Sequence, residues 1–263
     1  MRRLVAILAM LAAPAWAIPP QADDFWAAAA PSASGGLADD LIAHANCKAY
    51  WHSSYGVTLD GTNVTAWVDQ KSGIVAAPTN ASTTPWYWAA GMGGKGAVLF
   101  NNAQALNLDA TLSSTNSTTI LVGWKPNGLV PLYGLARYDS DGGPAMVPGN
   151  YTIYFNPDAN DTGIYGAING VSYSNNVVVA FSHTGGNVSS NNTLIYQNGT
   201  NLYGVVTLTT YPQAGPGPAY NRIGGRRNAF STGSLYAIVH FEPQLSDAEI
   251  TNFIRIVKTE WGI

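Results

Sequence analysis

Three adjacent aromatic residues are the strongest candidates for a binding surface. The segment Pro85-Trp86-Tyr87-Trp88 lies among Thr and Gly residues, a composition that indicates a loop. Sugars bind to flat apolar faces surrounded by hydrogen-bonding groups, so aromatic side chains among polar ones are the expected signature. Because neighbouring side chains alternate in an extended chain, at least one of the three rings should be exposed or cover an edge. The alternative is a buried aromatic cap over the rim of a sandwich.

Three arginines near the end of the chain are a second candidate group. Arg222, Arg226 and Arg227 either line a concave sheet face or simply solvate a loop. We therefore predict a carbohydrate-binding set of Trp86, Tyr87, Trp88 and Arg226.

An acidic segment in the middle of the chain is the candidate metal site. Asp139-Ser140-Asp141-Gly142-Gly143 is similar to the opening of a calcium loop, with oxygens at alternate positions and glycine for the bend. It lacks the later ligands, including a bidentate glutamate. Asp139 and Asp141 are the predicted ligands and calcium is the only predicted cofactor. The alternative is a solvated turn in which each aspartate caps its own backbone.

The acidic residues do not form a hydrolase pattern. A retaining glycosidase needs two carboxylates about 5 Å apart, which on a strand means alternate positions facing one side. The chain has only three glutamates, and Glu249 and Glu260 belong to its closing segment. The histidines His183 and His240 lie in predicted strands without a nearby nucleophile elbow. An enzyme is therefore the third hypothesis for this chain, behind two non-catalytic ones.

Composition indicates a β-rich chain without an electrostatic partner. Of its 263 residues only 10% are charged, and the net charge is −3. Binding to nucleic acid needs clustered Lys and Arg, which this chain lacks, so no nucleic-acid partner is expected. The abundance of aromatic, Gly and Pro residues and the scarcity of Glu favour strands and turns over helices.

The N-terminus is typical of an exported protein. Residues 1–17 combine Arg2 and Arg3, a short apolar run and the small residues Ala15 and Ala17, which is the pattern of a signal peptide. The run is too short to cross a bilayer, and the alternative is a retained hydrophobic anchor. Residues 18–43 are predicted to form a linker or arm with one short helix over 38–45. The single cysteine, Cys47, excludes an internal disulfide and is expected to be a small buried residue at the start of a strand.

Short apolar runs that alternate with turn signals predict an all-β sandwich over residues 44–263. Asn198-Gly199 predicts a hairpin, since both residues tolerate positive φ. Ser246 and Glu249 form a capping box ahead of apolar residues at helical spacing, which predicts one closing helix. The predicted strands cover residues 97–100, 118–124, 151–155, 177–182, 193–197, 203–209 and 235–241.

Several segments together resemble the concanavalin A-like, or laminin-G-like, jelly-roll family. They are Trp67-Val68-Asp69-Gln70-Lys71-Ser72-Gly73, Gly96–Phe100, Leu194–Gly199, Arg222–Gly225 with Gly233–Val239, and the closing Leu245–Ile263. Asn101-Asn102 stands where the family usually has Asp-Gly. The resemblance implies a two-sheet antiparallel jelly roll with a curved concave face and a short C-terminal helix. Members of this family often hold one calcium ion near an edge of the sandwich, so the resemblance also implies a candidate calcium site here.

These patterns lead to one main hypothesis and one alternative. The main hypothesis is an exported, non-catalytic lectin-like domain, secreted or at the cell surface, whose partner is a polysaccharide or cell-surface glycan. The alternative is a structural or decoration protein of a phage virion or surface assembly, with other virion or surface proteins as partners. No transmembrane span is expected in either case.

Overall fold

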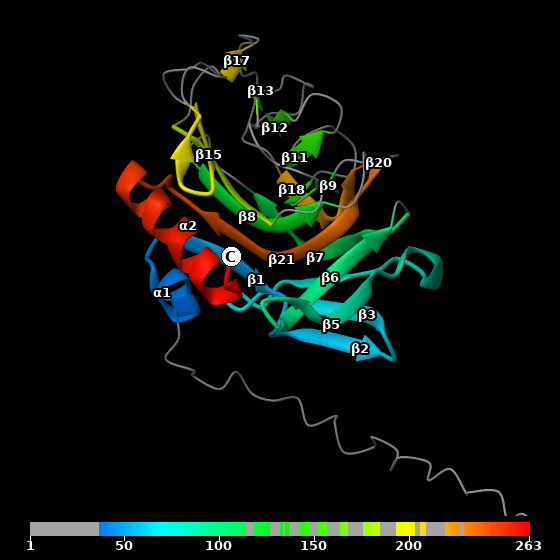
Figure 1. The fold of residues 1–263 in the computed structure, drawn as a ribbon. Helices are drawn as coiled ribbons and strands as arrows, with labels where there is room; N and C mark the ends of the chain where they lie inside the picture. The colour runs from blue at the N-terminus through cyan, green and yellow to red at the C-terminus, as the bar shows by residue number, and fades with distance from the viewer. Residues whose placement is uncertain are drawn as a thin grey trace, which may run out of the picture. The chain divides into compact units, whose positions relative to one another are not determined.

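The computed structural model describes two α-helices, a short 3-10 helix (η1, Ala81–Thr83) and a set of antiparallel strands (Figure 1). The described residues are 37–101, 103–113, 118–126, 132–133, 135–136, 143–147, 152–156, 164–167, 176–184, 193–202, 206–208, 219–226 and 229–263. Asp139 and Asp141, the predicted metal ligands, lie outside them. Within the described residues, no helix has the length and apolar character that crossing a membrane would require.

Fourteen strands pair into one antiparallel sheet. Its path runs β10-β18-β7-β4-β3-β5-β6-β21-β8-β14-β15-β16, with β1 paired to β21 and β2 to β3. The strands are β1 (Cys47–His52), β2 (Val57–Asp60), β3 (Asn63–Val68), β4 (Val75–Ala77), β5 (Trp86–Met92), β6 (Lys95–Asn101), β7 (Leu106–Ser113), β8 (Thr118–Pro126), β10 (Leu135–Ala136), β14 (Val177–His183), β15 (Thr193–Gln197), β16 (Thr200–Asn201), β18 (Ala219–Ile223) and β21 (Thr232–Phe241).

The other described strands form two smaller sheets. A five-stranded sheet has the order β17-β13-β12-β11-β9, and β19 pairs with β20. Their bounds are β9 (Leu132–Tyr133), β11 (Gly143–Val147), β12 (Thr152–Asn156), β13 (Ile164–Ala167), β17 (Val206–Leu208), β19 (Gly225–Arg226) and β20 (Ala229–Phe230).

The fourteen-stranded sheet folds into two layers around a shared core, which confirms the predicted all-β antiparallel sandwich. One layer contributes buried residues of β3, β4 and β7, such as Trp67 and Leu106, and the other contributes those of β1, β8 and β14, such as Trp51 and Trp124. Trp67 and Phe100, two of the largest side chains, are buried here as expected.

The second layer is buried on both of its faces. In β8, Ile120 and Val122 face the inner core, whereas Leu121 belongs to a second, outer core beneath the helices. All seven residues of β14 are buried for the same reason. This two-sided burial explains why these strands read as continuous apolar runs rather than as alternating ones.

A bulge in β21 adds an aromatic residue to the outer core. The register with β8 shifts between Leu235 and Ala237, so Tyr236 and Ala237 both face outward. Gly123 leaves the space for this ring, since a Cβ there would lie 2.3 Å from a ring carbon of Tyr236. The Tyr236 hydroxyl donates a hydrogen bond to the carbonyl of Val177.

Helices α1 (Leu37–Ala43) and α2 (Asp247–Trp261) cover the outer core (Figure 1). The apolar stripe of α2 is buried, with Ile250, Phe253 and Trp261 among its members. Leu41 of α1 is fully buried as well. The folded domain therefore includes α1, which lies inside the predicted linker 18–43, because a helix with a buried leucine belongs to the core and not to an arm.

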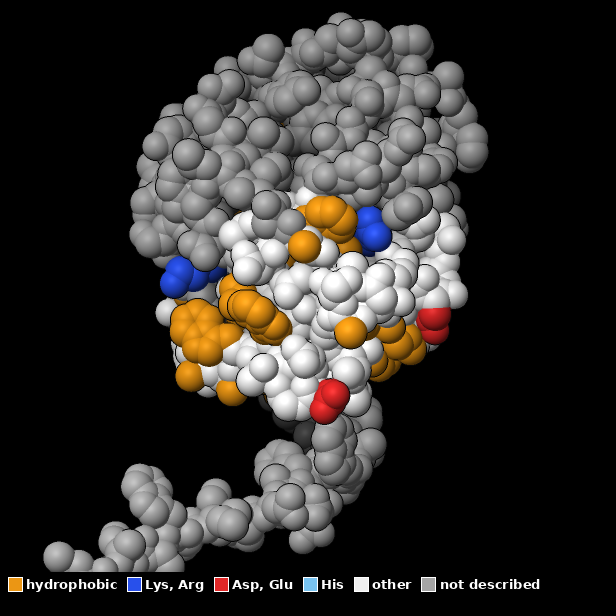
Figure 2. Space-filling view, turned by 90° about the vertical axis from the view of Figure 1, so that its right-hand side faces the viewer, with side chains coloured by type: hydrophobic (Ala, Val, Ile, Leu, Met, Phe, Trp, Pro, Cys, Tyr) orange, Lys and Arg blue, Asp and Glu red, His pale blue; other side chains and the backbone are white. Residues whose placement is uncertain are grey.

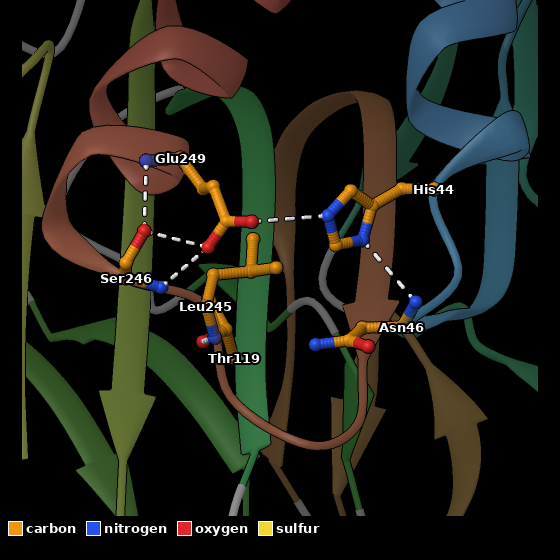
Figure 3. Close-up of polar contacts among 6 residues, drawn as sticks. All are labelled: His44, Asn46, Thr119, Leu245, Ser246 and Glu249. Atoms are coloured by element: carbon orange, nitrogen blue, oxygen red, sulfur yellow. Dashed lines mark hydrogen bonds and ion pairs between the residues drawn. The ribbon is translucent and has the colours of Figure 1, made fainter.

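The start of α2 is fixed by polar contacts that reach both α1 and the sheet (Figure 3). The Ser246 hydroxyl accepts from the Glu249 amide while the Glu249 carboxylate accepts from the Ser246 amide, which is the predicted capping box. Glu249 Oε1 lies 3.2 Å from Nε2 of His44, just after α1. The amide of Leu245 donates to the Thr119 hydroxyl in β8.

Local predictions from the sequence are largely confirmed. Asn198 and Gly199 have φ of 51° and 95° and close the β15–β16 hairpin. Asp69 is buried and its carboxylate accepts from the amides of Tyr50, Lys71 and Ser72, so it organises the predicted turn. Cys47 starts β1, and burial raises the pKa of its thiol to about 12, as expected of a structural cysteine.

The prediction of a loop at Pro85–Trp88 is wrong. Trp86 begins β5, which pairs with β3 on one side and β6 on the other. The amide of Tyr87 donates to the carbonyl of Thr62, and the carbonyl of Pro85 accepts from Val64. Proline is tolerated at the position just before a strand. Cross-strand pairing then fixes the extended backbone of β5, although the surrounding polar and glycine residues favour a loop.

Candidate functional site

The two tryptophans of β5 form an exposed aromatic pair. Trp86 and Trp88 are each 44% exposed, and as residues i and i+2 of a strand they share one side of the sheet. Tyr87 points to the opposite side and packs against the inner core. Burial raises the pKa of the Tyr87 phenol, in accord with this inward position. The pair therefore offers two indoles about 7 Å apart along one strand.

Strand register extends this pair across three more strands. Trp86 pairs with Leu99 of β6, Leu99 with Ser234 of β21, and Ser234 with Lys125 of β8. Directly paired residues share a face of the sheet, so these four side chains form one row. Lys125 Nζ lies 5.8 Å from the ring centroid of Trp88. We refer to Trp86, Trp88, Leu99 and Lys125 as the aromatic face.

The aromatic face continues the surface that α2 covers. Ala97, the partner of Trp88, belongs to the outer core beneath the helices. Two residues before Ala97, on the same side of β6, Lys95 forms an ion pair with Glu260 in the last turn of α2. The helix therefore ends where the exposed aromatic pair begins. In Figure 2, hydrophobic side chains gather in clusters on the described surface among many uncharged ones, with only a few charged side chains near them.

A buried histidine lies beneath this end of α2. His52 is fully buried, and its ring lies 4.4 Å from the rings of Trp261 and of Tyr55. Burial, together with the nearby Lys95 ammonium, lowers the pKa of His52 to about 3. Glu260 lies 3.6 Å from His52 Nε2 but is ion-paired with Lys95, so burial decides the outcome. His52 is therefore a neutral packing residue near neutral pH.

A groove lies on another side of α2, between this helix and the β15–β16 hairpin. Its volume is about 410 Å³. Arg255 and Lys258 provide positive charge, while Ile254 and Ile263 provide apolar surface. Arg255 also donates a hydrogen bond to Asn252. The groove is a second concave surface with cationic character, and none of the described residues that line it is acidic.

The described carboxylates that the contacts place have structural roles. Asp69 holds a turn, Glu249 caps α2 and Glu260 pairs with Lys95. Within the part of the chain that the structure describes, no group of three or more His, Cys, Asp or Glu side chains is arranged to hold a metal ion. Because Asp139 and Asp141 lie elsewhere, calcium binding stays a prediction.

The structure brings together only part of the predicted binding set. Trp86 and Trp88 share a face, whereas Tyr87 faces the interior. Arg226 lies in β19, where it pairs with Ala229. Lys125 was missed by sequence reasoning, because it is 37 positions beyond Trp88 in the printed sequence and only strand pairing brings them together.

Comparisons with known proteins define a fold rather than a family. No family model matches the chain, and no curated protein matches it. Among solved structures it is similar to domain 4 of AbnA, a GH43 extracellular arabinanase from Geobacillus stearothermophilus, in complex with arabinotriose. The TM-score is 0.53 and the identity 14%, over 80% of this chain and 98% of that one.

Two weaker similarities were also found. Trypanosoma rangeli sialidase in complex with sialic acid has a TM-score of 0.49 and 12% identity, over 83% of this chain and 34% of that one. The receptor-binding domain of botulinum neurotoxin type G has a TM-score of 0.49 and 14% identity, over 81% and 51%. This chain thus spans about a third of the sialidase and half of the neurotoxin domain. The fold that the arabinanase domain shares with this chain is an all-β sandwich.

Proposed function

We propose that this protein is an exported, non-catalytic, concanavalin A-like domain that recognises a polysaccharide through its aromatic face. The observation that carries the proposal is the pair of indoles on β5, each 44% exposed on one side of the sheet. Two large apolar rings that stay exposed beside an extensive core are unusual unless they contact a ligand or partner.

The chemistry of the aromatic face suits a sugar chain. An indole offers a wide apolar surface that accepts the C–H face of a sugar ring, and polar neighbours accept or donate to its hydroxyls. Two indoles along one strand can contact successive units of a chain. Leu99 extends the apolar floor, and Lys125 adds a hydrogen-bond donor at its side. A sheet built on both sides of β5 holds the rings in place without the entropy cost of ordering a loop.

The similarity to the arabinanase domain also supports polysaccharide recognition. Its structure contains arabinotriose, and this chain covers 98% of its length. At 14% identity the similarity extends to the fold and not to the ligand, so the sugar must be identified by experiment. Residues 1–17 support export, and N-terminal sequencing of the native protein tests it: a mature start at Ile18 is expected.

Affinity electrophoresis against a panel of soluble polysaccharides tests the proposal. The panel contains arabinan, xylan, β-glucan and pectin, and arabinotriose is measured separately by calorimetry. We expect retardation by at least one polymer. Trp86→Ala and Trp88→Ala should each weaken that binding at least tenfold, which corresponds to about 1.4 kcal/mol.

Tyr87→Phe is the matched control, because it alters the same strand on the opposite side of the sheet. It should leave binding unchanged, and thermal unfolding of all three variants should show that the fold persists. Binding that survives the loss of both tryptophans would exclude the aromatic face as the site. A chain that binds no polymer in the panel or on a glycan array would contradict the function itself.

A further inference from the structure

We propose that the aromatic face selects acidic polysaccharides, with Lys125 as the residue that reads the carboxylate or sulfate group. The inference rests on the proposed function and names the class of ligand for that same face. Its starting point is the placement of one ammonium group against one exposed indole.

Lys125 reaches the binding surface from a distant strand. It lies on β8, three strand positions from β5 in the order β5-β6-β21-β8, yet Lys125 Nζ is 5.8 Å from the centroid of Trp88. Because this ammonium lies over the Trp88 ring, an anionic group of a sugar bound at that ring can replace the indole as the partner of Lys125.

The charge of Lys125 is not balanced by an acidic side chain in the contacts of the described residues. The ion pairs there join Lys95 and His52 to Glu260, and His44 to Glu249. The other members of its row, Trp86, Leu99 and Ser234, are uncharged. Lys95 of β6 lies on the same side of the sheet, but its charge is already paired with Glu260 of α2. The aromatic face therefore carries one positive charge.

A ligand anion is a better partner for this ammonium than the indole it now faces. The attraction of a cation to an exposed ring is weak, whereas an ammonium and a carboxylate form a charge-assisted hydrogen bond. A neutral sugar hydroxyl gains only an ordinary hydrogen bond in the same place. The ammonium is a compact point charge without a planar fork, so it accepts a carboxylate or a sulfate in several orientations. The site should thus favour acidic sugars as a class.

The experiment compares polymers that differ only in charge. One pair is homogalacturonan of a single chain length in methyl-esterified and de-esterified form, and a second is unmodified and carboxymethylated β-glucan. The wild-type chain should bind the charged member of a pair at least fivefold more tightly at low salt. The preference should fall below twofold at 0.5 M NaCl, where charges more than about 4 Å apart are screened.

Lys125→Gln should remove the preference, because binding of the charged polymer should fall to the level of its neutral partner. Lys258→Gln is the matched control, because it removes one positive charge from the groove beside α2 instead of the aromatic face. It should keep the full preference. Unfolding curves of both variants confirm that the comparison concerns folded protein.

The possible failures are distinguishable. Equal binding of charged and neutral polymers, abolished by Trp88→Ala, overturns the inference and leaves the proposed function intact. A preference that disappears with Lys258→Gln but not with Lys125→Gln also overturns it, and assigns the anion to the groove. Binding of neither member of any pair overturns the inference together with the function on which it rests.

Discussion

The outer side of the sheet carries two aromatic surfaces that differ in what covers them. Beneath α2, Tyr236 and Phe241 of the sheet are fully buried in the outer core, together with Trp261 of the helix itself. Beyond the end of that helix, Trp86 and Trp88 keep 44% of their surface exposed. The same residue types on the same side of one sheet thus serve packing in one region and remain available to a ligand in the other.

The helix is what separates the two regions. Its last turn is held by the ion pair between Lys95 and Glu260, and Gly262 ends it in a left-handed conformation with φ of 65°. A Cβ on Gly93, in the turn between β5 and β6, would lie 2.1 Å from the carbonyl oxygen of Trp261, so the helix ends against this turn. The position of this helix end therefore decides how much of the sheet stays uncovered.

The largest expected effect is a loss of stability in the covered region. Trp261→Ala removes a fully buried indole from the outer core, and large-to-small core substitutions of this kind cost about 3–5 kcal/mol. Urea unfolding followed by far-ultraviolet circular dichroism measures it. Trp86→Ala serves as the comparison and should cost less than about 1 kcal/mol, because its ring is half exposed. Equal losses would mean that the two regions do not differ as described.

A pH dependence should also arise from two buried histidines, His52 in the covered region and His240 on the inner side of β21, where it pairs with Ile120. His52 and His240 are buried, and burial lowers their pKa values from 6.5 to about 3 and about 4. The unfolded chain therefore binds protons below pH 6.5 that the folded chain does not. Stability should be full above pH 6.5 and fall as pH decreases toward 4, by up to about 1.4 kcal/mol per pH unit for each histidine.

Unfolding by urea at pH 7, 6, 5 and 4 measures this slope. His52→Gln should make it shallower, since one of the two groups no longer titrates. A slope in this range that does not respond to substitution of either histidine would assign the acid sensitivity to other groups.

The smallest effect concerns the start of α2. Ser246→Ala removes the side chain that accepts from the Glu249 amide, and loss of such a cap costs about 1 kcal/mol. Hydrogen bonds from Ser246 lower the pKa of Glu249, so this contact stabilises the fold above the ordinary glutamate pKa of 4.5 and is lost as pH falls below it. The difference between wild type and Ser246→Ala should shrink at pH 3. Polysaccharide binding by the distant aromatic face should be unchanged in this variant.

Local signals in the sequence predict local structure well. The capping box at Ser246 and the turn at Asn198-Gly199 depend on residues a few positions apart, and both are confirmed. Each of the seven apolar runs predicted as strands overlaps an observed strand, because a strand's burial pattern depends mainly on its own residues, whereas most of the shorter strands were not predicted. The strand at Trp86 was missed because its surroundings read as a loop, and its pairing with β3 and β6 outweighs that local pattern.

The sequence alone determined an all-β sandwich with a closing helix, and it identified Trp86 and Trp88 as candidates for a binding surface. Only the tertiary structure decided that these two rings face outward together, that Tyr87 faces inward, and that Lys125 lies over Trp88. Strand register and the end of α2 set these positions. Both depend on contacts between residues far apart in the chain, which no local pattern encodes.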